Sequence, residues 1–107
     1  MANYDLFAWL DQENPNDHTG FFLGSLTAQQ VIALSPSLVK AQQAHDISLP
    51  VIGRAQLRRS SVRALMRIFE EHAAVQQDPV VGTSLAAALS IFRVASDLRV
   101  GIVWTTP

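Results

Sequence analysis

The residues best suited to chemistry in this sequence are five arginines near the middle of the chain. Arg59, Arg63 and Arg67 are spaced by four, so on a helix they share one face. Arg54 and Arg58 precede them, and together the five make up most of the eight basic residues. Such a concentration of positive charge is typical of a surface that binds an anion or an acidic partner. We therefore predict that these five arginines form a binding site.

Internal pairing is the competing interpretation of these arginines. They precede Glu70 and Glu71, whereas the helix dipole favours anions at the N-terminus and cations at the C-terminus, at about 0.3–1 kcal/mol for each exposed charge. Another interaction should offset that cost. Arg67 could pair with Glu71, and the other arginines with acidic residues near the start of the chain. Those residues, which we predict to form an acidic surface, are Asp11, Glu13 and Asp17, with Asp5 before them.

The composition limits the classes of function. The formal net charge of −1 makes nucleic acid an unlikely partner, since nucleic-acid binding relies on neutralising phosphates, and no aromatic residues are interleaved with the arginines. The chain has no cysteine, which excludes disulfide scaffolds, thiolate metal sites and cysteine nucleophiles. Only 16% of the residues are charged, which leaves room for a partner surface or for self-association.

Other residues with chemical potential carry weaker signals. His18, His45 and His72 do not share the spacing of a metal signature, so we expect surface or capping roles and no metal. The segment 82–84, Gly-Thr-Ser, could hold an anion at a helix start, but it lacks the lysine and glycine spacing of a phosphate loop. Capping by Thr83 or Ser84 is the favoured interpretation. No cofactor fingerprint is present, and we expect no cofactor.

The element that should lie at the centre of the core is a helix over residues 83–98. It is apolar nearly all round, and its polar line of Ser90, Arg93 and Asp97, with Ala86 one turn earlier, is narrow. A helix with so little polar surface is usually covered on most sides. We therefore expect the other elements to pack around it.

The remaining elements are predicted from local signals. Thr27 and Gln30 fit a capping box that starts a short helix, and Ser35-Pro36 starts a second helix at an angle to it. Residues 3–10 favour a strand over a helix, although by a small margin. The predicted elements are a strand over 3–10, a loop over 11–20, helices over 28–34, 35 to about 45 and 54–77, the central helix over 83–98 and a strand over 98–105.

These elements favour an α+β fold in a single domain over residues 1–107. Three to four helices should pack on a small sheet formed by the N- and C-terminal segments. Because two strands are marginal, a third should come from residues 21–23, from residues 51–52 or from a second subunit. The last alternative is a reason to expect a homodimer. Trp9, Phe21, Phe22 and Trp104 should gather where the two ends meet, as core or as a partner hot spot.

The function we predict is a small non-enzymatic protein-interaction module, as a homodimer or one half of a hetero-complex. The reasons are the lack of a catalytic, cofactor or metal signature in the sequence and the segregation of charge between its start and its middle. In size and style the chain is similar to small bacterial accessory proteins, including immunity and antitoxin-like proteins, although no residue pattern carries this similarity. The alternative is a small-ligand protein, or minor enzyme, that holds an anion in an arginine-lined pocket.

The expected location is the cytoplasm. The N-terminus lacks the basic region and apolar core of a signal peptide. The uncharged run over 19–39 is interrupted by glycines, proline and glutamines, and the run over 79–92 is shorter than the roughly 20 residues of a membrane span. We therefore expect no membrane association.

Overall fold

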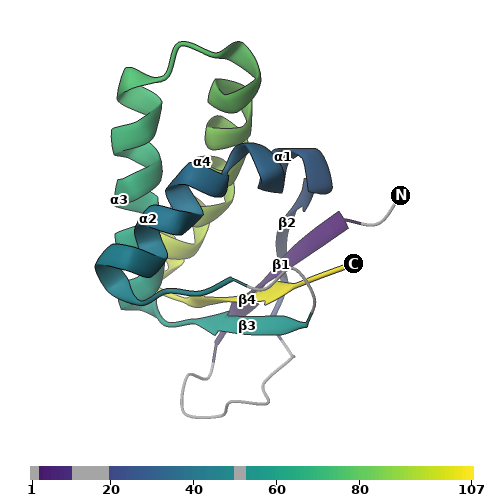
Figure 1. The fold of residues 1–107 in the computed structure, drawn as a ribbon. Helices are drawn as coiled ribbons and strands as arrows, with labels where there is room; N and C mark the ends of the chain where they lie inside the picture. Colours follow the sequence, from purple (N-terminus) through teal and green to yellow (C-terminus); the bar gives the residue numbers. More distant parts are fainter. Residues whose placement is uncertain (1–2, 11–19, 50–52) are drawn as a thin grey trace.

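The computed structural model describes residues 3–10, 20–49 and 53–107, which form four helices and a four-stranded antiparallel sheet (Figure 1). In chain order the elements are β1 (Asn3–Trp9), β2 (Phe22–Thr27), α1 (Ala28–Ala33), α2 (Ser35–His45), β3 (Arg54–Leu57), α3 (Arg59–Val75), α4 (Pro79–Leu98) and β4 (Gly101–Thr105). The fold is therefore of the α+β class, as the sequence predicted.

The sheet is built around the first and last strands. Its order is β2-β1-β4-β3, so β1 and β4 lie together in the centre and the other two strands form the edges. Asp5 pairs with Thr105 and Trp9 pairs with Gly101, so the register covers the whole of β4. The Thr105 hydroxyl also donates to the carbonyl of Asp5 at 2.8 Å. The prediction that the two terminal segments form one sheet is confirmed.

The further strands come from the same chain. β2 includes part of the predicted run over 21–23 and continues to Thr27, while the other predicted source, residues 51–52, lies outside the described residues. β3 provides the fourth strand. Because four strands are enough for a stable sheet, the sheet gives no reason to require a second subunit.

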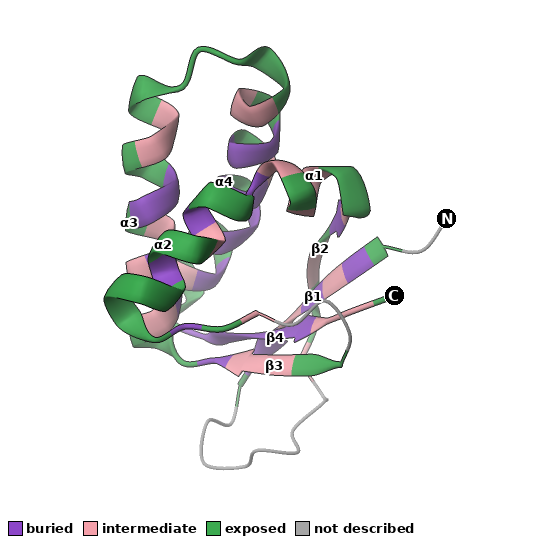
Figure 2. Cartoon of the chain, in the orientation of Figure 1, coloured by how far each residue is buried: buried purple, intermediate pink, exposed green. Residues whose placement is uncertain are grey.

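The helices cover one face of the sheet (Figure 1). Alternation along the central strands directs Tyr4 and Leu6 of β1 and Ile102 and Trp104 of β4 into the core with the buried helical residues. The rings of Tyr4 and Trp104 are in contact, with centroids 5.4 Å apart. Figure 2 shows buried residues along the central strands and on the inner sides of α3 and α4, with exposed residues on the outer sides.

The aromatic residues expected to gather where the chain ends meet lie on both faces of the sheet. Trp104 is in the core, whereas Trp9 is an odd-numbered residue of β1 and lies on the opposite face. There the guanidinium of Arg58 lies 5.8 Å from the Trp9 ring centroid. On the same face the Phe22 ring contacts the Phe7 ring edge-on, with centroids 5.6 Å apart, and Phe22 is 56% exposed.

The predicted central helix, α4, has the expected division of its surface. Leu85, Ala88 and Ala95 are buried, and Phe92 meets Phe69 of α3 edge-on with ring centroids 5.2 Å apart. Its predicted polar line of Ser90, Arg93 and Asp97 is exposed, as is Ala86 one turn earlier. By length and composition alone α4 could also cross a membrane, a test that the core helix of a soluble protein passes equally.

The start of α4 differs from the prediction. The helix begins at Pro79, because Asp78 caps it by accepting a hydrogen bond from the backbone N–H of Val80 at 2.9 Å. Proline suits the first helical position, where its missing N–H costs nothing. Thr83 and Ser84 are therefore not caps but helical residues. Their hydroxyls donate to the carbonyls of the preceding turn, at 2.8 and 2.9 Å.

The helix predicted over residues 54–77 is also shorter than expected. Residues Arg54–Leu57 form β3, and α3 runs without a break from Arg59 to Val75. Ala55 pairs with Trp104 and Leu57 pairs with Ile102, so the two apolar side chains of β3 join the core with strand spacing. Pairing with β4 therefore outweighs the helical pattern in the sequence of these residues.

The boundaries of the first two helices are close to the prediction. The Gln30 side chain accepts from the Thr27 backbone N–H at 2.8 Å, and the Thr27 hydroxyl accepts from the Gln30 N–H at 3.1 Å. This is the predicted capping box. α2 begins at Ser35 with Pro36 in its first turn and ends at His45, and the C-cap residue Asp46 adopts a left-handed conformation with φ of 55°.

Two glycines provide a matched test of the packing around the central strands. A side chain at Gly101 would overlap the carbonyl oxygen of Leu57 and lie 3.1 Å from the Trp9 ring, whereas a side chain at Gly82 in α4 meets nothing within 4 Å. We predict that Gly101→Ala lowers the free energy of unfolding by about 1–3 kcal/mol. Gly82→Ala should raise it by roughly 0.5–1 kcal/mol. Urea denaturation followed by circular dichroism measures both, and equal stabilities would contradict this packing.

Candidate functional site

The strongest candidate site is a groove between α2 and α3. The two helices run antiparallel, since Ser37 at the start of α2 contacts His72 near the end of α3, while His45 and Ser60 border one cavity at the opposite ends. The groove has a volume of about 350 Å³. The residues that line this α2/α3 groove are Lys40 and His45 from α2 and Ser60, Arg63, Ala64, Arg67, Ile68 and Glu71 from α3.

The position of the arginines in this groove follows from the buried face of α3. Val62, Leu65 and Phe69 are buried in the core. Residues 63, 67 and 71 are one position or two away from this line, so their side chains emerge at the edge of the helix beside α2. Arg63, Arg67 and Glu71 are all exposed. The spacing of four that placed the arginines on one face is thus realised on α3.

The three cations of the groove lack anionic partners within the described part of the chain. Among the described residues, the side chains of Arg93 and Glu70 form an ion pair at 4.0 Å, and neither residue lines the groove. Lys40, Arg63 and Arg67 form no such pair with a described residue. The predicted pair of Arg67 with Glu71 is therefore not formed, although both side chains line the groove. Their charges remain available to an external partner.

The other predicted arginines lie elsewhere. Arg58 lies over the Trp9 ring, Arg54 is in β3, and Arg59 is the first residue of α3. Arg54 and Arg59 each already have an interaction partner. Of the five arginines predicted to form one site, Arg63 and Arg67 therefore line the groove, whereas Arg54, Arg58 and Arg59 are not among its lining residues. The predicted acidic surface, Asp11, Glu13 and Asp17, lies outside the described residues.

Two groove residues were missed from the sequence. No sequence pattern marks Lys40 as a site residue, and the histidine spacing predicts a surface or capping role for His45, because both precede α3 by many residues and belong to another helix. They join the arginines only through the antiparallel packing of α2 on α3. α2 contains one lysine and no arginine, so no regular spacing of cations along that helix could have indicated Lys40.

A serine and a histidine form a second feature that sequence reasoning missed. The Ser37 hydroxyl oxygen lies 2.7 Å from Nδ1 of His72, a hydrogen-bonding distance. Such a pair is the first requirement of a serine nucleophile with its base. Ser37 is only 2% exposed, however, so a substrate could not reach its hydroxyl. We interpret the bond as a link that fixes α2 against α3 and so sets the geometry of the groove.

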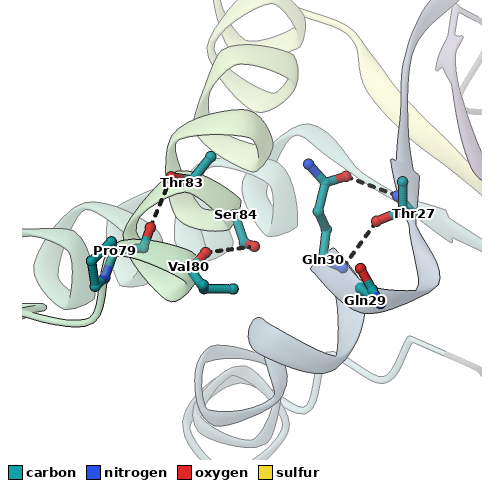
Figure 3. A pocket seen from close by; sticks show the side chains of 7 residues that line it. All are labelled: Thr27, Gln29, Gln30, Pro79, Val80, Thr83 and Ser84. Carbon is teal, nitrogen blue, oxygen red and sulfur yellow. Dashed lines mark hydrogen bonds between the residues drawn. The ribbon is translucent and has the colours of Figure 1, made fainter.

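A second cavity lies between α1 and the start of α4 (Figure 3). It has a volume of about 420 Å³ and is lined by uncharged residues, namely Thr27, Gln29, Gln30, Pro79, Val80, Thr83 and Ser84. The hydroxyls of Thr83 and Ser84 already donate within α4, and Thr27 is engaged with Gln30 in the capping box (Figure 3). This cavity therefore offers no charged group to an anion, and the segment 82–84 considered above does not form an anion site.

The comparisons with known proteins add no candidate. Neither the family models, nor the curated proteins, nor the solved structures contain a match to this chain. Across residues 3–10, 20–49 and 53–107, no group of three or more metal-binding side chains comes together. The charges of the α2/α3 groove are therefore the feature on which a function can be argued.

The link between α2 and α3 can be tested by removing its hydroxyl. We predict that Ser37→Ala lowers the free energy of unfolding by about 1–2 kcal/mol, because it leaves a part-buried imidazole nitrogen without its partner. Ser90→Ala is the matched control, since Ser90 is exposed on a helix, and should change stability by less than about 0.5 kcal/mol. Urea denaturation compares the two variants. An equally small effect of both would show that the bond does not hold α2 in place.

Proposed function

We propose that this chain is a small non-enzymatic interaction protein that binds an acidic protein partner through the α2/α3 groove. The observation that supports this proposal is the set of three cations, Lys40, Arg63 and Arg67, that line one groove without an ion pair to any described residue. Unpaired positive charges on two packed helices are complementary to carboxylates on another protein. An immunity or antitoxin role would be one instance of such an interaction.

The exposure of these cations favours a protein over a small anion. An exposed ion pair contributes about 0.2–1 kcal/mol, so one or two such contacts hold a small anion only weakly. Lys40, Arg63 and Arg67 are all exposed, and among the described side chains that line the groove no buried polar donor is present. A protein segment can contact all three cations at once and bury the stems of the arginines as well. The alternative of an anion-binding protein or minor enzyme is therefore less favoured.

Nucleic acid fits the groove less well than an acidic protein does. Glu71 lies in the groove beside Arg67 and would repel a uniformly negative phosphate backbone, whereas a protein can place a cationic side chain at that position. The lining residues include no aromatic side chain on which a base could stack. The net charge of −1 also provides no wider positive surface along which a polyanion could continue.

The proposal predicts that binding depends on the groove arginines and not on net charge. Arg63→Ala/Arg67→Ala should bind a fluorescein-labelled decaglutamate peptide roughly tenfold more weakly than the original chain, because two ion pairs are lost. Arg93→Ala/Arg99→Ala removes the same charge outside the groove and should change affinity less than about twofold. Fluorescence anisotropy at low ionic strength measures all three proteins. Equal weakening by the two variants would assign binding to net charge and contradict the proposal.

The same pair of variants identifies a physiological partner. A protein retained from a source lysate by the original chain and by Arg93→Ala/Arg99→Ala, but lost with Arg63→Ala/Arg67→Ala, binds through the groove. Retention by all three immobilised proteins would place the contact on another surface. Circular dichroism of each variant verifies that the fold is unchanged.

A further inference from the structure

The α2/α3 groove carries its charges in a definite order along α3. Arg63, Arg67 and Glu71 follow one another at a spacing of four, and all three line the groove. From the start of α3 toward its end the order is therefore positive, positive, negative. None of these side chains pairs with another described residue within 4.0 Å. A partner that lies along α3 in the groove therefore contacts two positive charges and then one negative charge.

The spacing of these charges matches that of another helix. Residues four apart on a helix lie one turn apart, with Cβ atoms about 5–6 Å from each other. A helix that lies along α3 repeats its own side chains at the same interval, and a groove between two helices is a common seat for a third. The small side chain of Ala64, between the arginines in the groove, leaves room for a close approach. Each charge of α3 can then meet one charge of the partner.

We propose that the groove recognises the order of charges on a partner helix. Counted from the start of α3 toward its end, the partner presents two carboxylates and then a cation, each four residues apart. The carboxylates pair with Arg63 and Arg67, and the cation pairs with Glu71. Lys40 faces the groove from α2 and provides a second contact for the acidic turns. This inference rests on the proposed function and adds to it the kind of segment that binds.

A second copy of the chain does not satisfy this order. In a two-fold pair of antiparallel α3 helices, residue 67 lies at the symmetry axis when residue 63 of one copy meets residue 71 of the other. Arg63 would then pair with Glu71 of the second copy, but the two Arg67 side chains would face each other. Like charges in contact across an interface are unfavourable. The groove therefore fits a different chain better than it fits itself.

The test uses two alanine-based helical peptides of the same composition and net charge. One carries Glu, Glu and Lys at four-residue spacing, and the other carries Glu, Lys and Glu. The second order matches α3 in neither direction, because its lysine always meets Arg67. We expect the original chain to bind the first peptide about tenfold more tightly, as measured by fluorescence anisotropy with the labelled peptides at low ionic strength.

A variant in which two charges of α3 are exchanged separates recognition of charge order from any general difference in affinity between the two peptides. Arg67→Glu/Glu71→Arg keeps the composition and net charge of α3 but changes the order to positive, negative, positive. Both positions are exposed, so the fold should be retained, which circular dichroism verifies. The preference should then reverse, with the Glu-Lys-Glu peptide bound about tenfold more tightly. A reversal supports recognition of charge order.

The remaining outcomes separate this inference from the proposed function. Equal affinity for both peptides, lost with Arg63→Ala/Arg67→Ala, would overturn recognition of charge order and leave the acidic-partner proposal intact. An unchanged preference in the exchanged variant would likewise overturn it. If neither these peptides nor decaglutamate bind to the original chain, both the charge-order inference and the proposed function are wrong.

Discussion

The pairing of β1 with β4 is the interaction on which the rest of the structure depends. It joins residues about one hundred positions apart, from Asp5 with Thr105 to Trp9 with Gly101. Within the described sheet, β2 pairs with β1 and β3 pairs with β4, so the hydrogen bonding of both edge strands depends on the central pair. The same two strands present Leu6, Ile102 and Trp104 to the helices. Sheet and core therefore form together, and each stabilises the other.

The candidate site depends on this arrangement through α3. The pairing of β3 with β4 fixes the point at which α3 leaves the sheet, and Val62, Leu65 and Phe69 fix its rotation about its axis. That rotation directs Arg63 and Arg67 toward α2. The contact of Ser37 with His72 holds α2 alongside. The groove is thus a consequence of core packing on one side of α3 and of the packing of α2, with its bond from Ser37 to His72, on the other.

Local signals in the sequence were enough for much of the fold but not for the site. The capping box of Thr27 with Gln30 and the four-residue spacing of the arginines depend on near neighbours, and both are realised in the structure. Lys40 reaches the groove only through helix packing, which no local pattern encodes. Residues 54–57 form a strand although their sequence pattern is helical, because they pair with β4, which is distant in the sequence. Capping by Thr83 or Ser84 was predicted, whereas Asp78 caps α4 and Pro79 begins it, one turn earlier in the chain.

The central position of β1 also has a consequence for synthesis in the cell. Among the described elements β1 is translated first and its partner β4 last, some 95 residues later. At about 5–20 residues per second, the apolar side chains of Tyr4 and Leu6 wait roughly 5–20 s for that strand. During this interval β1 can pair with β2, but the other edge of β1, to which β4 binds in the folded protein, has no partner strand. The central pair of strands therefore forms only after β4 has been translated.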